Sequence, residues 1–99
     1  MLMAFRRNSN WNKKSELEAL LIFKILEQEQ FPRNRQMELC RQMSERYDLS
    51  AENISAKVGN YKSEALINNA SNSSKETVET YKKYKELSIV ELQDIIKNI

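Results

Sequence analysis

The sequence contains no histidine, and this absence removes several classes of chemistry. Ser/His and Cys/His nucleophile pairs, histidine-based acid–base catalysis and the histidine-containing metal sites of common nucleases are excluded. A metal site made of carboxylates alone needs Asp and Glu on a shared surface, whereas Asp48 and Asp94 lie far apart in the sequence. We therefore expect a protein that is not an enzyme and that holds no metal and no cofactor.

Helix breakers and cysteine are also scarce, with one Gly, one Pro and one Cys in 99 residues. This composition favours helix, and we expect the single thiol, Cys40, to be a small buried residue without a disulfide. No stretch approaches the roughly 18 apolar residues of a membrane span, and the first ten residues lack the apolar core of a secretion signal. These absences predict a cytoplasmic protein that makes no use of a membrane.

The length of the chain fits one compact domain. The net charge is only +2, so the distribution of charge says more about partners than its total does. We expect an all-α fold, with a three-helix core of the helix-turn-helix type followed by two C-terminal helices. The predicted organisation is a flexible basic arm over residues 1–10 and a single helical domain over residues 11–99, divided into a trihelical core (11–67) and a helical pair (74–99).

Three helices are predicted between residues 12 and 63, because apolar residues recur there at helical spacing. Asn12 is a suitable N-cap for the first helix, which we expect at the centre of the core, and Ser50 for the third. Pro32 interrupts the pattern after the first helix, and Gly59 inside the third indicates a close approach to the backbone or a local helix end. The apolar stripes are Leu17, Leu20, Leu21 and Ile25; Leu39, Cys40, Met43 and Tyr47; and Ile54, Val58 and Tyr61.

The C-terminal pair follows a polar run over residues 68–74 that predicts a loop. Ser73 with Glu76, and Ser88 with Glu91, have the spacing of capping boxes. The last helix carries an apolar stripe that reaches the end of the sequence and must be covered either by the body of the protein or by a second copy in a homodimer. Its members are Ile89, Leu92, Ile96 and Ile99.

The third helix carries candidate base-contacting residues, Asn53, Lys57 and Asn60. Asn pairs bidentately with adenine and Lys reaches the acceptors of guanine, so an outward face of this kind suits the major groove of double-stranded DNA. The alternative is that this face of the third helix is an ordinary solvated surface. Trp11 is interpreted as a core residue at the entrance of the first helix. Candidate phosphate contacts are Lys13, Lys14, Arg33, Arg35 and Lys62, with Arg6 and Arg7 on the arm as minor-groove candidates or as an ordinary chain terminus.

Two segments resemble known helical modules. The sequence from Asn10 through Trp11 and Glu16 to Leu21 is similar to the opening of Myb-like DNA-binding repeats, although the later tryptophans of such repeats are missing. The segment from Asn53 to Ser63 is similar to helical modules found ahead of HNH nuclease domains in bacterial and phage proteins. Because histidine is absent, the resemblance implies an accessory or targeting role without the nuclease activity.

The sequence therefore predicts a small DNA-binding protein of the helix-turn-helix type, a bacterial or phage transcription regulator. The alternative is a non-catalytic adaptor or inhibitor, encoded by a mobile element, that docks on a host nuclease or defence protein. In that case the stripe from Ile89 to Ile99 and the tyrosines of the preceding helix supply the anchor, since Tyr is favoured at interface centres.

Overall fold

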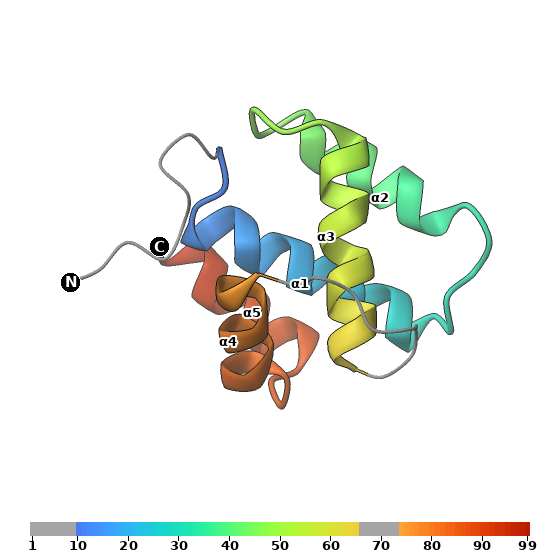
Figure 1. The fold of residues 1–99 in the computed structure, drawn as a ribbon. Helices are drawn as coiled ribbons and strands as arrows, with labels where there is room; N and C mark the ends of the chain where they lie inside the picture. Colours follow the sequence, from blue (N-terminus) through green and yellow to red (C-terminus); the bar gives the residue numbers. More distant parts are fainter. Residues whose placement is uncertain (1–9, 66–73) are drawn as a thin grey trace.

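The computed structural model describes residues 10–65 and 74–99, and within these ranges all regular structure is helical. The all-α prediction is therefore confirmed. Figure 1 shows α3 lying across α1, with α2 on one side of α3 and α4 on the other. The helices are α1 (Lys13–Gln28), α2 (Arg35–Ser44), α3 (Ala51–Glu64), α4 (Lys75–Tyr84) and α5 (Ile89–Lys97).

α1 is the central element of the core, as its apolar sequence predicts. It contacts each of the other four helices, and Leu17, Leu20 and Phe23 are almost fully buried. The predicted cap is also present: Asn12 Oδ1 accepts from the backbone N–H of Ser15 at 2.9 Å, and Ser15 Oγ accepts from the backbone N–H of Asn12 at 2.9 Å. This reciprocal pair satisfies two backbone donors that would otherwise have no partner.

α2 is shorter than its apolar stripe predicts. It ends at Ser44, so Tyr47 lies in the connection to α3 and not on α2. In this connection the Tyr47 hydroxyl donates to Glu18 of α1, which also accepts from Arg46 at 2.6 Å. Ser50 caps α3 as predicted, with its Oγ 3.1 Å from the backbone nitrogen of Asn53.

The two C-terminal helices pack separately on the three-helix body, with α4 against α3 and α1, and α5 against α1. The predicted Ser88–Glu91 capping box of α5 is present. The cap of α4 is Ser74, whose Oγ is 3.2 Å from the backbone nitrogen of Thr77, so the capping residue lies one position beyond the predicted Ser73. Ser73, and the loop predicted from residue 68 up to it, lie outside the described residues.

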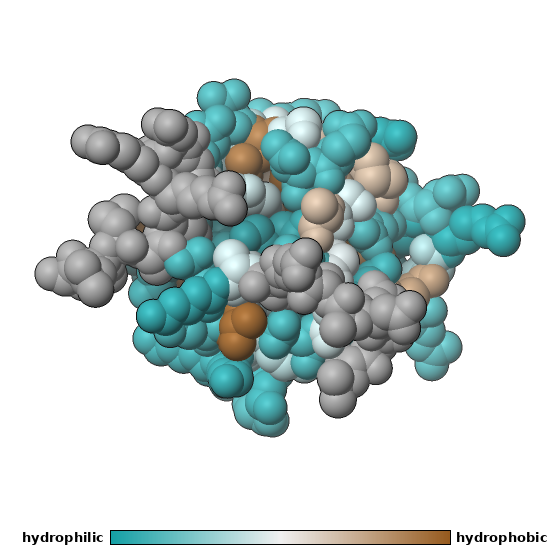
Figure 2. All heavy atoms as spheres, in the orientation of Figure 1, coloured by the Kyte–Doolittle hydropathy of each residue, from teal (hydrophilic) through white to brown (hydrophobic). Residues whose placement is uncertain are grey.

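The apolar stripe of α5 is covered by α1 over most of its length. Leu92 and Ile96 are buried, whereas Ile99 is 53% exposed. Val90, on the opposite side of α5, is 72% exposed. In Figure 2 the hydrophobic side chains on the visible face form separate small areas among hydrophilic ones. The described helices include none with the length and hydropathy to span a bilayer.

The end of α1 is a Schellman motif that carries an unusual residue. The N–H of Phe31 donates to the carbonyl of Leu26 at 2.8 Å, and the N–H of Gln30 donates to that of Glu27 at 3.1 Å. This motif places Gln30 at the left-handed position usually taken by glycine, with φ 66°. Phe31 is also left-handed, and its ring packs 6.1 Å from that of Phe23, which holds the turn in place.

Gln30→Gly is expected to raise the free energy of unfolding by about 1 kcal/mol, because glycine adopts the left-handed conformation without the penalty of a Cβ atom. Urea unfolding followed by circular dichroism measures the change. The matched control is Gln28→Gly, in the last helical turn, which should lower stability by a similar amount. An unchanged or lowered stability of Gln30→Gly would contradict the assignment of this turn.

Gly59→Ala is expected to stabilise the protein by about 1 kcal/mol, because Gly59 lies inside α3 and, apart from its chain neighbours and the backbone of its own helix, no described atom is within 4 Å of an added Cβ. The sequence predicted a close contact or a helix end at Gly59, and within the described residues neither is present. Thermal unfolding tests this, with Ala56→Gly on the same helix as the reversed control. Loss of stability in Gly59→Ala would mean that something packs against this backbone.

Candidate functional site

The candidate site is built on α3, which is held by neighbours on three sides. Its inner residues Ile54, Val58 and Tyr61 are fully buried against the core. α2 packs along one flank and α4 along the other, as Figure 1 shows. Side chains of α3 therefore fall into three groups: the inner stripe, the two flanks and an outer face.

Lys57 lies on the flank covered by α4 and not on the outer face. Its Nζ is 2.9 Å from Glu16 Oε1 of α1 and 3.0 Å from Thr77 Oγ1 of α4, and it lies 4.6 Å from the ring centre of Trp11. Only 11% of its side chain is exposed. The expectation that Lys57 is presented outward for base contact is therefore wrong.

Helix geometry explains this placement. Each residue of an α-helix turns by about 100°, so Lys57 stands only about 40° from Tyr61 and about 60° from Ile54 around the axis. The residue just before Val58 is therefore beside the inner stripe and not opposite to it. A lysine at such a position extends along the flank, and here it finds a buried carboxylate.

That carboxylate, Glu16, is the centre of a hydrogen-bonded cluster joining α1, α3 and α4. The Tyr61 hydroxyl donates to Glu16, and Thr77 Oγ1 is 3.1 Å from Glu16 Oε2. The side chain of Glu16 is 1% exposed, and a charge in such a place is tolerated only when it is paired and hydrogen-bonded. Burial, with a further contribution from Glu16, raises the pKa of Tyr61, so this phenol stays protonated and donates.

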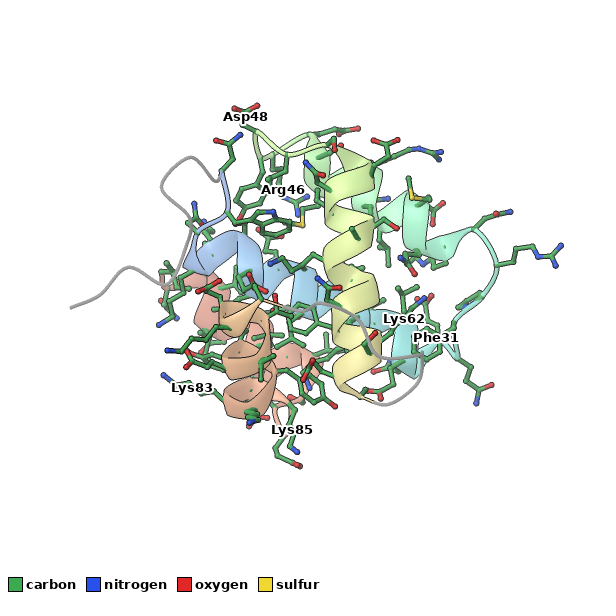
Figure 3. All side chains as sticks on the ribbon, viewed as in Figure 1. Phe31, Arg46, Asp48, Lys62, Lys83 and Lys85 are labelled. Atoms are coloured by element: carbon green, nitrogen blue, oxygen red, sulfur yellow. The ribbon has the colours of Figure 1, made fainter. Side chains whose placement is uncertain are left out.

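Lys62 occupies the opposite flank, facing α2. Its Nζ is 2.5 Å from Gln36 Oε1 and 5.2 Å from the ring centre of Phe31. Gln36 also donates to Ser55 Oγ at 2.8 Å. Figure 3 shows Lys62 and Phe31 close together at the lower end of α3. Both lysines of α3 are thus directed to its flanks.

What remains is the α3 outer face, which we define as Glu52, Asn53, Ala56, Gly59 and Asn60. The first three are exposed and the last two are half-buried. The only charge on this face is the carboxylate of Glu52. Of the three predicted base-contacting residues, Asn53 is exposed and Asn60 half-buried, whereas Lys57, on the same side of the helix, has its ammonium group enclosed by Glu16 and Thr77.

The predicted phosphate contacts do not form one basic surface. Arg35 is bound by carboxylates, with its Nε 3.0 Å from Glu29 and its guanidinium also on Glu38. Lys13 is exposed and Lys14 half-buried at the start of α1, whereas the exposed Arg33 follows its end. The ends of a helix of 16 residues are roughly 24 Å apart, so these cations lie at opposite ends of the core. Arg6 and Arg7 lie outside the described residues.

Potential metal ligands and the single thiol were also located in the part of the chain that the structure describes. Residues 10–65 and 74–99 hold no group of three potential metal ligands. Cys40 is buried, as predicted, and burial raises its pKa to about 11, so the thiol is protonated at neutral pH. The cluster around Glu16 was not predicted from the sequence. The signal that could have indicated it is the position of Lys57 next to the inner stripe, but this position does not show which carboxylate the lysine binds.

Comparisons of the chain with protein-family models, with curated proteins and with solved structures gave no match.

Lys57→Met is expected to lower the free energy of unfolding by about 3 kcal/mol or more, because it leaves the Glu16 carboxylate buried without its cation. The double variant Glu16→Gln/Lys57→Met should recover much of the loss, which a double-mutant cycle of thermal unfolding measures. Lys82→Met, at an exposed position of α4, is the control and should be near neutral. If Lys57→Met were also neutral, the buried ion pair would be excluded.

Proposed function

We propose that this protein is a non-catalytic binding module that docks on another protein through the α3 outer face. One observation carries the proposal: both lysines of α3 are bound on its flanks, by Glu16 and by Gln36, and the outer face keeps no cation. The α3 outer face offers a partner the exposed amide of Asn53 and the small residues Ala56 and Gly59, with the exposed carboxylate of Glu52 beside them.

This composition suits a protein partner better than a phosphate backbone. Affinity for DNA comes largely from Lys and Arg that neutralise phosphates, and a recognition helix without cations gives up that contribution. The core of a protein interface is instead depleted of charge. Ala56 and Gly59 add little bulk, so a helix or strand of the partner can approach the backbone of α3 closely. The expected partner surface is weakly charged and offers hydrogen-bonding groups to the exposed Asn53 amide.

The resemblance of residues 53–63 to modules that precede HNH nuclease domains makes a nuclease the first class of partner to test. An adaptor or inhibitor of such an enzyme needs no catalytic group of its own. It needs a rigid face, and α3 is supported on three sides by packed helices.

Double-stranded DNA is a second candidate partner, favoured by the two amides. Asn53 and Asn60 are seven residues apart, which places them on one side of α3 about two helical turns apart. Each is of a residue type that pairs with adenine in the major groove. If DNA is the partner, Lys57 makes no base contact, and the phosphates are contacted by Lys13, Lys14 and Arg33.

The test is capture of partners from host lysate by the tagged full-length protein and two arginine variants. Ala56→Arg places a long cation on the α3 outer face, whereas Val90→Arg places one at an exposed position of α5. We expect the wild type and Val90→Arg to recover one stoichiometric protein at both about 50 mM and about 500 mM salt, and Ala56→Arg to lose it. An apolar or amide interface resists screening, unlike phosphate contacts.

Two results would overturn the proposal. One is recovery of the same protein by Ala56→Arg, which would move the interface elsewhere. The other is recovery of nucleic acid alone with a steep loss at the higher salt, together with tight binding of duplex DNA in an anisotropy titration. That outcome would establish DNA as the partner.

A further inference from the structure

α4 is attached to the body in a different way from the other helices. α5 is anchored by the buried aliphatic side chains of Leu92 and Ile96. On α4 the most buried residue is Thr77, which is fully enclosed, and the largest anchors are Tyr84 and the half-buried Tyr81. The contact of α4 with the body is therefore made by hydroxyl groups and tyrosine rings, without a buried aliphatic residue among its anchors.

The surface under α4 is polar as well. Thr77 Oγ1 is 3.0 Å from Lys57 Nζ and 3.1 Å from Glu16 Oε2. α4 thus closes the cluster of Glu16, Lys57 and Tyr61 on the side that would otherwise face water.

Such a contact is easier to open than an apolar one. When α4 leaves, water can replace each hydrogen bond that it made, so the net loss per bond is small. Water makes no equivalent replacement when aliphatic surface is exposed, so the free energy gained by burying that surface is lost. The tyrosines resist opening, since the Tyr81 ring lies 6.3 Å from that of Phe23 and 6.4 Å from that of Tyr61.

The C-terminal end of α4 is held to the body, so that α4 can swing away from the body about this end. Lys24 Nζ of α1 donates to the carbonyl of Lys85 at 2.7 Å, so the connection from α4 to α5 is tied to the body. α4 and α5 make little direct contact with each other. α5 can therefore stay on α1 while α4 moves.

We propose that α4 is a releasable cover: it detaches as a unit while α1, α2, α3 and α5 remain packed, and its release uncovers the Lys57 flank of α3. The uncovered flank adjoins the α3 outer face and enlarges it with an ammonium group and a phenol. The use of the enlarged surface by a partner rests on the proposed function, whereas the detachment itself does not.

Native-state hydrogen exchange of the full chain, followed by NMR, tests the detachment without any partner. Amides of α4 from Val78 to Tyr84 are expected to exchange together, at least about 100-fold faster than the inner amides of α1, α3 and α5, because they open without global unfolding. Exchange of the α4 amides at the same rate as those of α1 and α3 would overturn the proposal.

Thr77→Val tests the hydroxyl contact, since it keeps the shape and removes the hydrogen bonds. The measured quantity is the exchange rate of the α4 amides divided by that of the α5 amides. This ratio should be about 10-fold higher in Thr77→Val than in the wild type. Acetylation of the intact protein by an N-hydroxysuccinimide ester provides a second readout, and Lys57 should react faster in this variant by a similar factor. Unchanged exchange and unchanged Lys57 labelling would show that Thr77 does not hold a cover. Neither measurement needs a partner, so their outcomes do not depend on whether the lysate capture recovers one.

Discussion

The structure depends on one buried ion pair. Glu16 and Lys57 come from different helices, and neither is tolerated in a core without the other. Their bond fixes how α3 is rotated on α1, because a different rotation would leave a carboxylate without its cation. The Tyr61 and Thr77 hydroxyls complete the coordination of Glu16 and extend the same constraint to α4. Three helices are thus aligned by a single carboxylate, around which the aliphatic core packs.

This constraint also shapes the α3 outer face, the proposed binding surface. The cation that a helix-turn-helix protein would direct at DNA is used here to hold α3 in place, and the second lysine of the helix is bound by Gln36. The outward side of α3 carries Asn53, small residues and the carboxylate of Glu52, but no cation. In the proposed function this face packs against another protein, and the proposed release of α4 enlarges it.

Local signals in the sequence predicted much of the fold. Asn12, Ser50 and Ser88 cap helices as expected, because capping depends on residues within one turn. Tyr47 was wrongly placed on the second helix, which ends at Ser44; its hydroxyl bonds to Glu18, 29 positions away, and a contact of this kind is not visible in a local pattern. The left-handed Gln30 was also missed, since the sequence has no glycine at that turn.

The candidate site was harder to predict than the fold. Asn53 was placed correctly on an exposed face, but Lys57 was not, although its angular distance from the inner stripe gave a warning. Its partners Glu16 and Thr77 lie 41 and 20 positions away, on helices that pattern alone does not bring together. Helical spacing can place such a side chain beside the inner stripe, but tertiary packing decides which groups it binds.

The most direct test of this account is an NMR observation of the Lys57 side chain at neutral pH. The account predicts a slowly exchanging ammonium signal, with nuclear Overhauser contacts from the Lys57 methylenes to the Thr77 methyl group and the Trp11 ring. An ammonium signal lost to rapid exchange, with side-chain shifts like those of exposed lysines and no such contacts, would contradict it.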